Sequence, residues 1–128
     1  MKRSPIMRRT QISRRTGVKA ANARRVRGRR LEAFGTDARV SWWRGLSCAC
    51  KGLHPSCSRG WSDPTHVTST GAGGKAHDII PLSRRCHTEQ HAHGWIKWHT
   101  LAQLPLEYAA ELAEQLSRLG PDAPGCGP

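Results

Sequence analysis

The sequence predicts a small α+β domain behind a basic N-terminal arm, and three observations support this prediction. Residues 1–34 contain 12 of the 21 Lys and Arg residues and one acidic residue, so they hold +11 of the net charge of +12. Two short strand-like segments then precede a histidine-rich helical segment. The 128 residues, 37% of them hydrophobic, suffice for one small core with tails and suggest that a metal ion helps to stabilise it.

Residues 1–35 are expected to form a disordered arm. Pro5 and the lack of an apolar face argue against a folded element, although residues 20–33 have helical potential that Gly28 weakens. Basic arms of this kind usually follow phosphate backbones; a solubilising tail or a membrane-surface tail is the alternative. The residues expected to contact nucleic acid are Lys2, Arg3, Arg8, Arg9, Arg14, Arg15, Arg24 and Arg25.

The folded domain is expected over residues 36–120, followed by a flexible tail over 121–128. Apolar periodicity, glycine-rich turns and prolines divide this domain into short elements. In order, they are a helix over 37–46, strands over 65–69 and 77–82, a helix over 86–100 that bends near Gly94, and a helix over about 105–119. No apolar run approaches the ~18–20 residues that span a bilayer. The N-terminus also lacks the apolar region of a secretory signal.

The cysteines predict a metal site. Their odd number, without a secretory signal, argues against a secreted disulfide framework. Three of them fall within ten residues, which favours metal binding. A four-thiolate zinc site would consist of Cys48, Cys50, Cys57 and Cys86. His54 is a less favoured fourth ligand, buried free thiols are the alternative, and Cys126 in the tail is expected to be a free thiol.

Two histidines suggest a second metal site. His87 and His91 are four residues apart, so a helix places them on one face, where neutral imidazoles can bind a single divalent ion. Arg84 and Arg85 stand in the turn before this helix, where they can contact phosphate; a solvated turn is the alternative. His66 lies in the first expected strand, and Asp78 opens the second.

The stretch DPTHVTSTGAGGKAHDIIPLSRRCHTEQH, residues 63–91, resembles the HNH endonucleases, which carry a ββα-metal motif. More narrowly, it resembles small phage and prophage HNH proteins associated with recombination. The resemblance covers about residues 40–117, with the ββα core over about 62–95. Related proteins often carry a C-x-x-C pair before and after the strands. Here Ser83 stands where the first cysteine of the second pair is expected.

The resemblance assigns roles to the polar residues of this core. His66 becomes the general base, with a third metal ligand or a packed strand histidine as the alternatives. His87 and His91 become ligands of the catalytic ion. Asp63 becomes a third ligand, or only orients His66 or a bound water. Asp78 occupies the position of the family's Asn, which braces the loop and orients the catalytic histidine.

A metal-dependent DNA endonuclease is the function that this resemblance implies. Hydrolysis would leave a 3′-hydroxyl and a 5′-phosphate, with Mg²⁺, Mn²⁺ or Zn²⁺ at the catalytic site and a structural zinc nearby. Imidazole suits the base because its ordinary pKa of about 6.5 leaves it largely neutral at pH 7. The expected setting is phage or prophage recombination or DNA processing in the bacterial cytoplasm, with DNA and phage or host recombination proteins as partners and no membrane. The alternative is a non-catalytic, zinc-stapled nucleic-acid-binding module.

Overall fold

The computed structural model describes residues 22–125 and divides the chain into two units, residues 1–31 and residues 32–128. Residues 22–34 are helical, so the described part of the expected arm is folded, as the helical potential at 20–33 indicated. Arg24 and Arg25 are exposed on this helix. The other six basic residues expected to contact nucleic acid lie outside the described residues.

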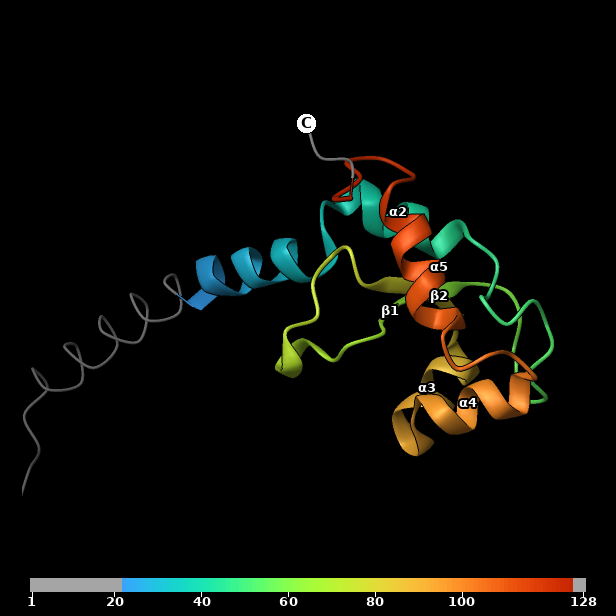
Figure 1. Cartoon of the computed structure of the whole chain (residues 1–128). Helices are drawn as coiled ribbons and strands as arrows, with labels where there is room; N and C mark the ends of the chain where they lie inside the picture. The colour runs from blue at the N-terminus through green and yellow to red at the C-terminus, as the bar shows by residue number, and fades with distance from the viewer. Residues whose placement is uncertain (1–21, 126–128) are drawn as a thin grey trace, which may run out of the picture. The chain divides into compact units, whose positions relative to one another are not determined.

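The second unit is a small α+β domain, as the sequence predicts. Its two strands form an antiparallel sheet, and helices precede and follow the sheet (Figure 1). The elements are α2 (Asp37–Gly45), β1 (Ser62–His66), the 3₁₀ turn η1 (Thr70–Ala72), β2 (Ile79–Ser83), α3 (Arg84–His93), α4 (Trp95–Ala102) and α5 (Tyr108–Ser117). Over residues 22–125, no helix has the length and apolar character needed to cross a membrane.

The first strand begins and ends three residues earlier than the sequence pattern predicts, because Pro64 is tolerated within it. Pro64 lies directly opposite Pro81, and the Pro81 carbonyl accepts a hydrogen bond from the Ala49 backbone N–H (2.7 Å) instead of from the neighbouring strand. In an antiparallel pair, alternate residue pairs exchange no hydrogen bonds, so the missing proline N–H groups leave no gap here.

The turn between the strands depends on Gly74. A Cβ added there would lie 2.0 Å from the carbonyl oxygen of Thr68, so only glycine fits without moving the backbone. The backbone N–H of Thr68 in turn donates to the Asp78 carboxylate (2.7 Å). The glycine-rich turn lies within the twelve residues, 67–78, that connect β1 to β2.

Gly94 separates α3 from α4 with φ 88°, which confirms the predicted bend. The last helix begins at Tyr108 rather than at Pro105. Residues 105–108 instead form a turn, closed by a hydrogen bond from the Tyr108 backbone N–H to the Pro105 carbonyl (3.0 Å). Leu106 is consequently exposed and does not join the buried stripe of α5.

The core is built around β2, whose five residues are all buried. Helix α5 packs on this strand, and Trp98 of α4 joins the same cluster of buried side chains. This cluster also contains three of the cysteines, Cys48, Cys50 and Cys86. The predicted metal site is therefore part of the hydrophobic core and not a surface attachment.

A buried arginine connects α2 to the end of α5. The Arg39 guanidinium is fully buried and donates to the carbonyl oxygens of Leu116 (3.0 Å) and Leu119 (2.6 Å). Carbonyls at a helix C-terminus lack partners within the helix and carry partial negative charge, so a cation satisfies them well. Arg39 thus fastens α2 to the C-terminal end of α5.

Candidate functional site

The four predicted cysteine ligands lie together. The Sγ atoms of Cys48, Cys50, Cys57 and Cys86 all lie within 4.8 Å of one another, and this arrangement could hold a metal ion such as zinc. The Sγ atoms of Cys48 and Cys50 are 3.5 Å apart, and those of Cys50 and Cys86 are 3.8 Å apart. Zn–S bonds of about 2.3 Å in a tetrahedron place sulfurs at similar separations. The grouping predicted from the sequence is confirmed.

The thiol of Cys57 lies close to where the thiol of a cysteine at position 83 would lie. Its Sγ lies 3.4 Å from the Oγ of Ser83. Ser83 instead caps α3 by accepting a hydrogen bond from the Cys86 backbone N–H (3.4 Å). His54 is buried and its Nδ1 accepts from the Ser56 backbone N–H (3.1 Å), so it is not a member of the ligand group.

The protonation of the thiols shows why this cluster suits a cation. A hydrogen bond from Cys86 lowers the pKa of Cys48 to about 4. Burial raises the pKa of Cys50 to about 11, and the hydrogen bond that Cys86 gives to Cys48 raises the pKa of Cys86 as well. The Cys48 thiolate is therefore stable without a cation, and the thiols of Cys50 and Cys86 resist ionisation. A bound divalent ion would displace their protons and neutralise the buried charge.

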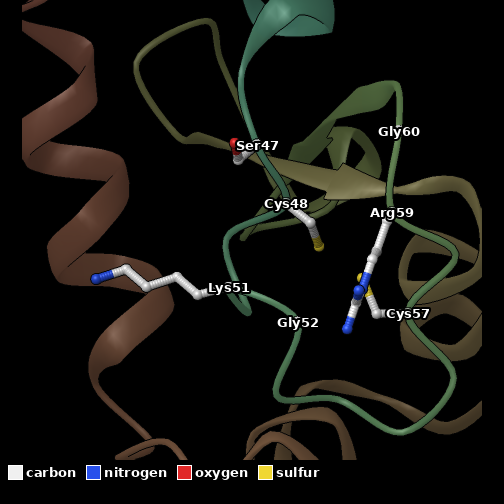
Figure 2. A pocket seen from close by; sticks show the side chains of 7 residues that line it. All are labelled: Ser47, Cys48, Lys51, Gly52, Cys57, Arg59 and Gly60. Atoms are coloured by element: carbon white, nitrogen blue, oxygen red, sulfur yellow. The ribbon is translucent and has the colours of Figure 1, made fainter.

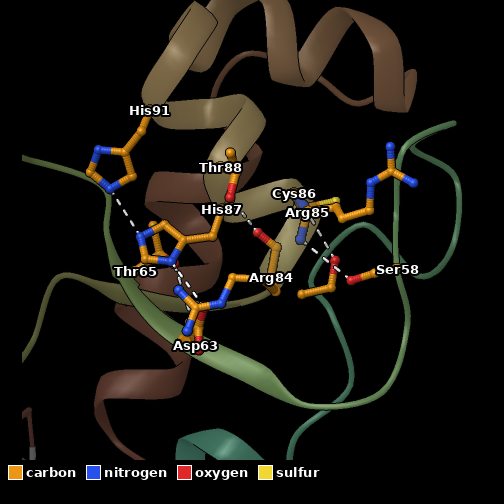
Figure 3. Close-up of polar contacts among 10 residues, drawn as sticks. Ser58, Asp63, Thr65, Arg84, Arg85, Cys86, His87, Thr88 and His91 are labelled. Carbon is orange, nitrogen blue, oxygen red and sulfur yellow. Dashed lines mark hydrogen bonds and ion pairs between the residues drawn. The ribbon is translucent and has the colours of Figure 1, made fainter.

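The two histidines of α3 point their ring nitrogens at each other. The Nε2 atoms of His87 and His91 are 2.9 Å apart (Figure 3). The other ring nitrogen of His87, Nδ1, lies 3.2 Å from the carboxylate of Asp63 on β1. At these distances His87 donates from Nδ1 and presents an Nε2 lone pair, which is the tautomer that a metal ligand needs.

Asp63 lies against His87 and not against His66. Its carboxylate also pairs with the Nε of Arg84 (3.3 Å). Among residues 22–125, the four cysteines are the only group of three or more potential ligand atoms that all lie within 4.8 Å of one another. His87 and His91 therefore offer two candidate ligand nitrogens side by side. The Asp63 carboxylate contacts the other ring nitrogen of His87.

His66 ends β1, and its ring is held by a backbone group that no sequence pattern indicates. Its Nε2 lies 2.6 Å from the carbonyl oxygen of Ala33, so Nε2 carries the proton and donates it. Phe34 packs edge-on against the ring with centroids 4.7 Å apart. Burial lowers the pKa of His66 below its ordinary value of 6.5, against the raising effects of the Ala33 hydrogen bond and the Asp78 charge.

Asp78 braces the loop after β1, but it does not orient the His66 ring in the way the resemblance led us to expect. Its carboxylate accepts from the Thr68 backbone N–H, and its own carbonyl accepts from the Val67 backbone N–H (2.9 Å). Within residues 22–125, the hydrogen bond that fixes the His66 ring is the one that its Nε2–H donates to the Ala33 carbonyl. The Asp78 carboxylate therefore stabilises the turn, and the Ala33 carbonyl orients the His66 ring.

One pocket brings the histidines of both elements together. It has a volume of about 490 Å³, and His66, His87 and His91 line it, with Gln90 beside them. Phe34 and Trp95 supply apolar walls. His77 is exposed and is not among the lining residues. The strand–turn–strand–helix order therefore converges on one concave site with a candidate base and a candidate metal pair.

The two arginines expected to contact phosphate lie at the start of α3. Arg84 is exposed and pairs with Asp63, while Arg85 is exposed and donates its backbone N–H to the Oγ of Ser58 (3.3 Å) (Figure 3).

Comparison with family models, with curated proteins and with solved structures gave no match to this chain. The chemistry of the site thus has to be argued from its own residues.

Proposed function

We propose that this protein is a metal-dependent DNA endonuclease in which His66 takes a proton from the attacking water. The observation that supports this proposal is the pocket that His66 shares with the His87–His91 pair. Phosphodiester hydrolysis needs a base for the water and positive charge near the scissile phosphate. A strand histidine facing a helical histidine pair provides a place for both.

His66 suits the role of base in its tautomer and in its protonation state. Because Nε2–H donates to the Ala33 carbonyl, Nδ1 keeps its lone pair and is available to accept a proton. Because burial lowers its pKa, the ring is neutral at pH 7. Phe34 and the Ala33 hydrogen bond together restrict the ring to one orientation.

His87 and His91 would hold the catalytic ion, which we take to be Mg²⁺, Mn²⁺ or Zn²⁺. Their Nε2 atoms lie 2.9 Å apart, so one cation could replace the hydrogen bond that joins the two rings without it. When bound, such an ion supplies positive charge beside the phosphate oxygens. Asp63 would fix the orientation and tautomer of His87 from behind, as a positioning residue rather than a third ligand.

We expect Asp63→Asn to weaken binding of the catalytic ion by roughly 10- to 100-fold, which is the usual cost of losing a carboxylate behind a ligand histidine. Isothermal titration with Mn²⁺, on protein whose cysteine site already holds zinc, measures this affinity. Glu89→Gln is the matched control, because Glu89 pairs with His93 outside the pocket. Unchanged Mn²⁺ affinity in Asp63→Asn would contradict the positioning role.

The four cysteines would hold a structural zinc, and basic residues would bind the DNA backbone. The candidate phosphate contacts are Lys2, Arg3, Arg8, Arg9, Arg14, Arg15, Arg24, Arg25, Arg84 and Arg85. Counterion release by such residues makes affinity fall steeply with salt. The resemblance to small phage and prophage HNH proteins supports a role in recombination or DNA processing in the bacterial cytoplasm, with phage or host recombination proteins as partners.

Plasmid nicking tests the endonuclease proposal. Purified protein with zinc in the cysteine site is incubated with supercoiled plasmid and Mg²⁺, Mn²⁺ or additional Zn²⁺. We expect open-circle product with at least one of these ions, carrying a 3′-hydroxyl and a 5′-phosphate at the nick. No product with any ion, in protein that binds DNA and is folded, would refute the proposal.

The buried cysteine group favours a second candidate function, a zinc-stapled nucleic-acid-binding module without catalysis. Such a group could stabilise the fold whether or not the histidine pocket reacts. Metal analysis separates the two functions. One zinc per chain and no binding of a second divalent ion would favour the binding module, whereas a second ion that requires His87 and His91 would favour the enzyme.

A further inference from the structure

Trp61 lies one residue before β1 and is 77% exposed. Exposed large aromatic side chains often belong to binding sites, because their apolar surface gains from being covered. The other tryptophans described, at 42, 43, 95 and 98, are buried or half-buried. Trp61 therefore stands apart as an aromatic surface that the fold itself does not use.

Basic residues occur in the two chain segments that meet near this tryptophan. The residue after Trp61, Ser62, pairs with Ser83 in the sheet, and Arg84 and Arg85 follow Ser83 as exposed residues at the start of α3. The hydrogen bond from the Arg85 backbone N–H to Ser58 brings the 58–61 segment, which contains Arg59, beside the start of α3. A charged partner at these two segments would therefore have to be anionic.

A hollow of about 580 Å³ reaches Gly60, the residue before Trp61 (Figure 2). Its lining includes Cys48 and Cys57 of the candidate zinc site, and the Arg59 side chain extends across it toward Gly52, whereas the Lys51 side chain points away from Arg59. Arg59 has a left-handed backbone conformation, with φ 54°, which is costly for residues other than glycine. The fold therefore holds one cation beside the cysteine cluster in a conformation that its sequence alone would not favour.

We propose that Trp61 stacks on an unpaired nucleobase while Arg59 and Arg85 bind the neighbouring phosphates. Every base has a π-face, so stacking on an aromatic side chain is tolerant of sequence, but it requires a base that is free of its own neighbours. The protein would then prefer DNA with unpaired bases over continuous duplex. This inference rests on the proposed function only in taking DNA as the partner.

Binding of a fluorescent oligothymidine strand tests this proposal. Affinity is measured by anisotropy in the full chain carrying His66→Ala, which prevents cleavage, at about 0.3 M salt to weaken nonspecific electrostatic binding. Trp61→Leu should weaken binding roughly 5- to 150-fold, the range found on removing a stacking aromatic. Trp61→Phe should stay near the original affinity because it keeps a π-face. Ile96→Ala, at an apolar side chain that is 72% exposed, should change nothing.

An abasic strand of the same length isolates the stacking contribution. On that strand the original protein and Trp61→Leu should bind with equal affinity, and on continuous duplex of the same sequence the two should also be equal. Circular dichroism and zinc content confirm that each variant is folded.

Three results would overturn the proposal. These are equal binding of the thymidine strand by Trp61→Leu and the original protein, the same loss of affinity on the abasic strand, and a change in oligomeric state on substitution, which would make Trp61 a contact between copies of the chain. Nicking of plasmid by protein with an intact His66 is scored separately. A failure of the endonuclease proposal is therefore distinguishable from a failure of this one.

Discussion

Replacing His66 with alanine should lower the rate of plasmid nicking by roughly 100- to 10,000-fold, the usual contribution of a general base. The variant loses the ring that offers Nδ1 as the proposed proton acceptor, while the His87–His91 pair is untouched. Plasmid binding and metal content should remain at their original levels. Initial rates of open-circle formation at saturating divalent ion measure the effect.

His77→Ala is the matched control for this experiment. His77 is exposed, lies two residues before β2 and does not line the pocket, so its removal should leave the nicking rate within about twofold. Equal rates in His66→Ala and the original protein would remove His66 from the reaction. Equal losses in both variants would point to a general effect of removing a histidine.

The pH dependence of nicking gives an independent reading of the same residue. The pKa of His66 lies below 6.5 because burial disfavours the imidazolium form, so the neutral ring still predominates at pH 6.5. The midpoint of the fall in rate should therefore lie below pH 6.5, as His66 takes up a proton. Metal content is measured at each pH, because metal binding is itself pH-dependent. A fall centred above 6.5 at constant metal content would contradict the assignment.

The sequence predicted the elements that depend on local pattern. The order of strands and helices, the bend at Gly94 and the grouping of four cysteines all follow from residue types and spacing, and all are present. The boundary of β1 did not follow, because the tolerance of Pro64 depends on its pairing with Pro81. That pairing is a property of the sheet register and not of either segment.

The site could be predicted only where side-chain identity carries the chemistry. His66, His87 and His91 stand out as residue types, and the structure places them around one pocket. The carbonyl of Ala33 that holds His66 comes from a residue 33 positions earlier, and a backbone group leaves no mark in the sequence. The resemblance predicts Asp63 as a metal ligand, but its actual neighbour is Nδ1 of His87, and that contact depends on how α3 packs on β1.

Loss of a metal ion from the four-cysteine group should destabilise the domain strongly. Cys48, Cys50 and Cys86 are buried within the core, so removing the ion leaves packed thiols where a charged tetrahedral site would stand. Zinc binding contributes on the order of 10 kcal/mol in small zinc domains. Even half of that loss, at roughly 4–8 °C per kcal/mol for a domain of this size, would lower the Tm by more than about 20 °C.

Cys50→Ser tests this expectation, since Cys50 is fully buried within the group. Thermal unfolding followed by circular dichroism, with zinc content measured on the same sample, should show both the metal and the stability lost together. Cys126→Ser is the matched control, because Cys126 lies outside the described residues and the group of four is complete without it. A metal-free Cys50→Ser protein with an unchanged Tm would show that the metal does not stabilise the fold.

A rescue experiment tests the identity of the fourth ligand. Cys57→Ser alone should lose zinc and stability. Combining it with Ser83→Cys should restore both, because the Cys57 Sγ lies only 3.4 Å from the Ser83 Oγ. The exchange removes the serine that caps α3, at a cost of about 1 kcal/mol, which is small beside the metal contribution. Zinc retained by Cys57→Ser would exclude Cys57 as a ligand.

The double variant is informative because it moves a ligand between chain segments while keeping its place in space. Cys57 belongs to the loop before β1, whereas residue 83 ends β2 and is followed three residues later by Cys86. A cysteine at 83 would create a C-x-x-C spacing with Cys86 directly after the second strand. Restored zinc in the double variant would mean that the ion requires four sulfurs at one point, from whichever segment they come. Failure to restore zinc, with Ser83→Cys alone stable, would mean that the loop carrying Cys57 must itself be fastened to the core.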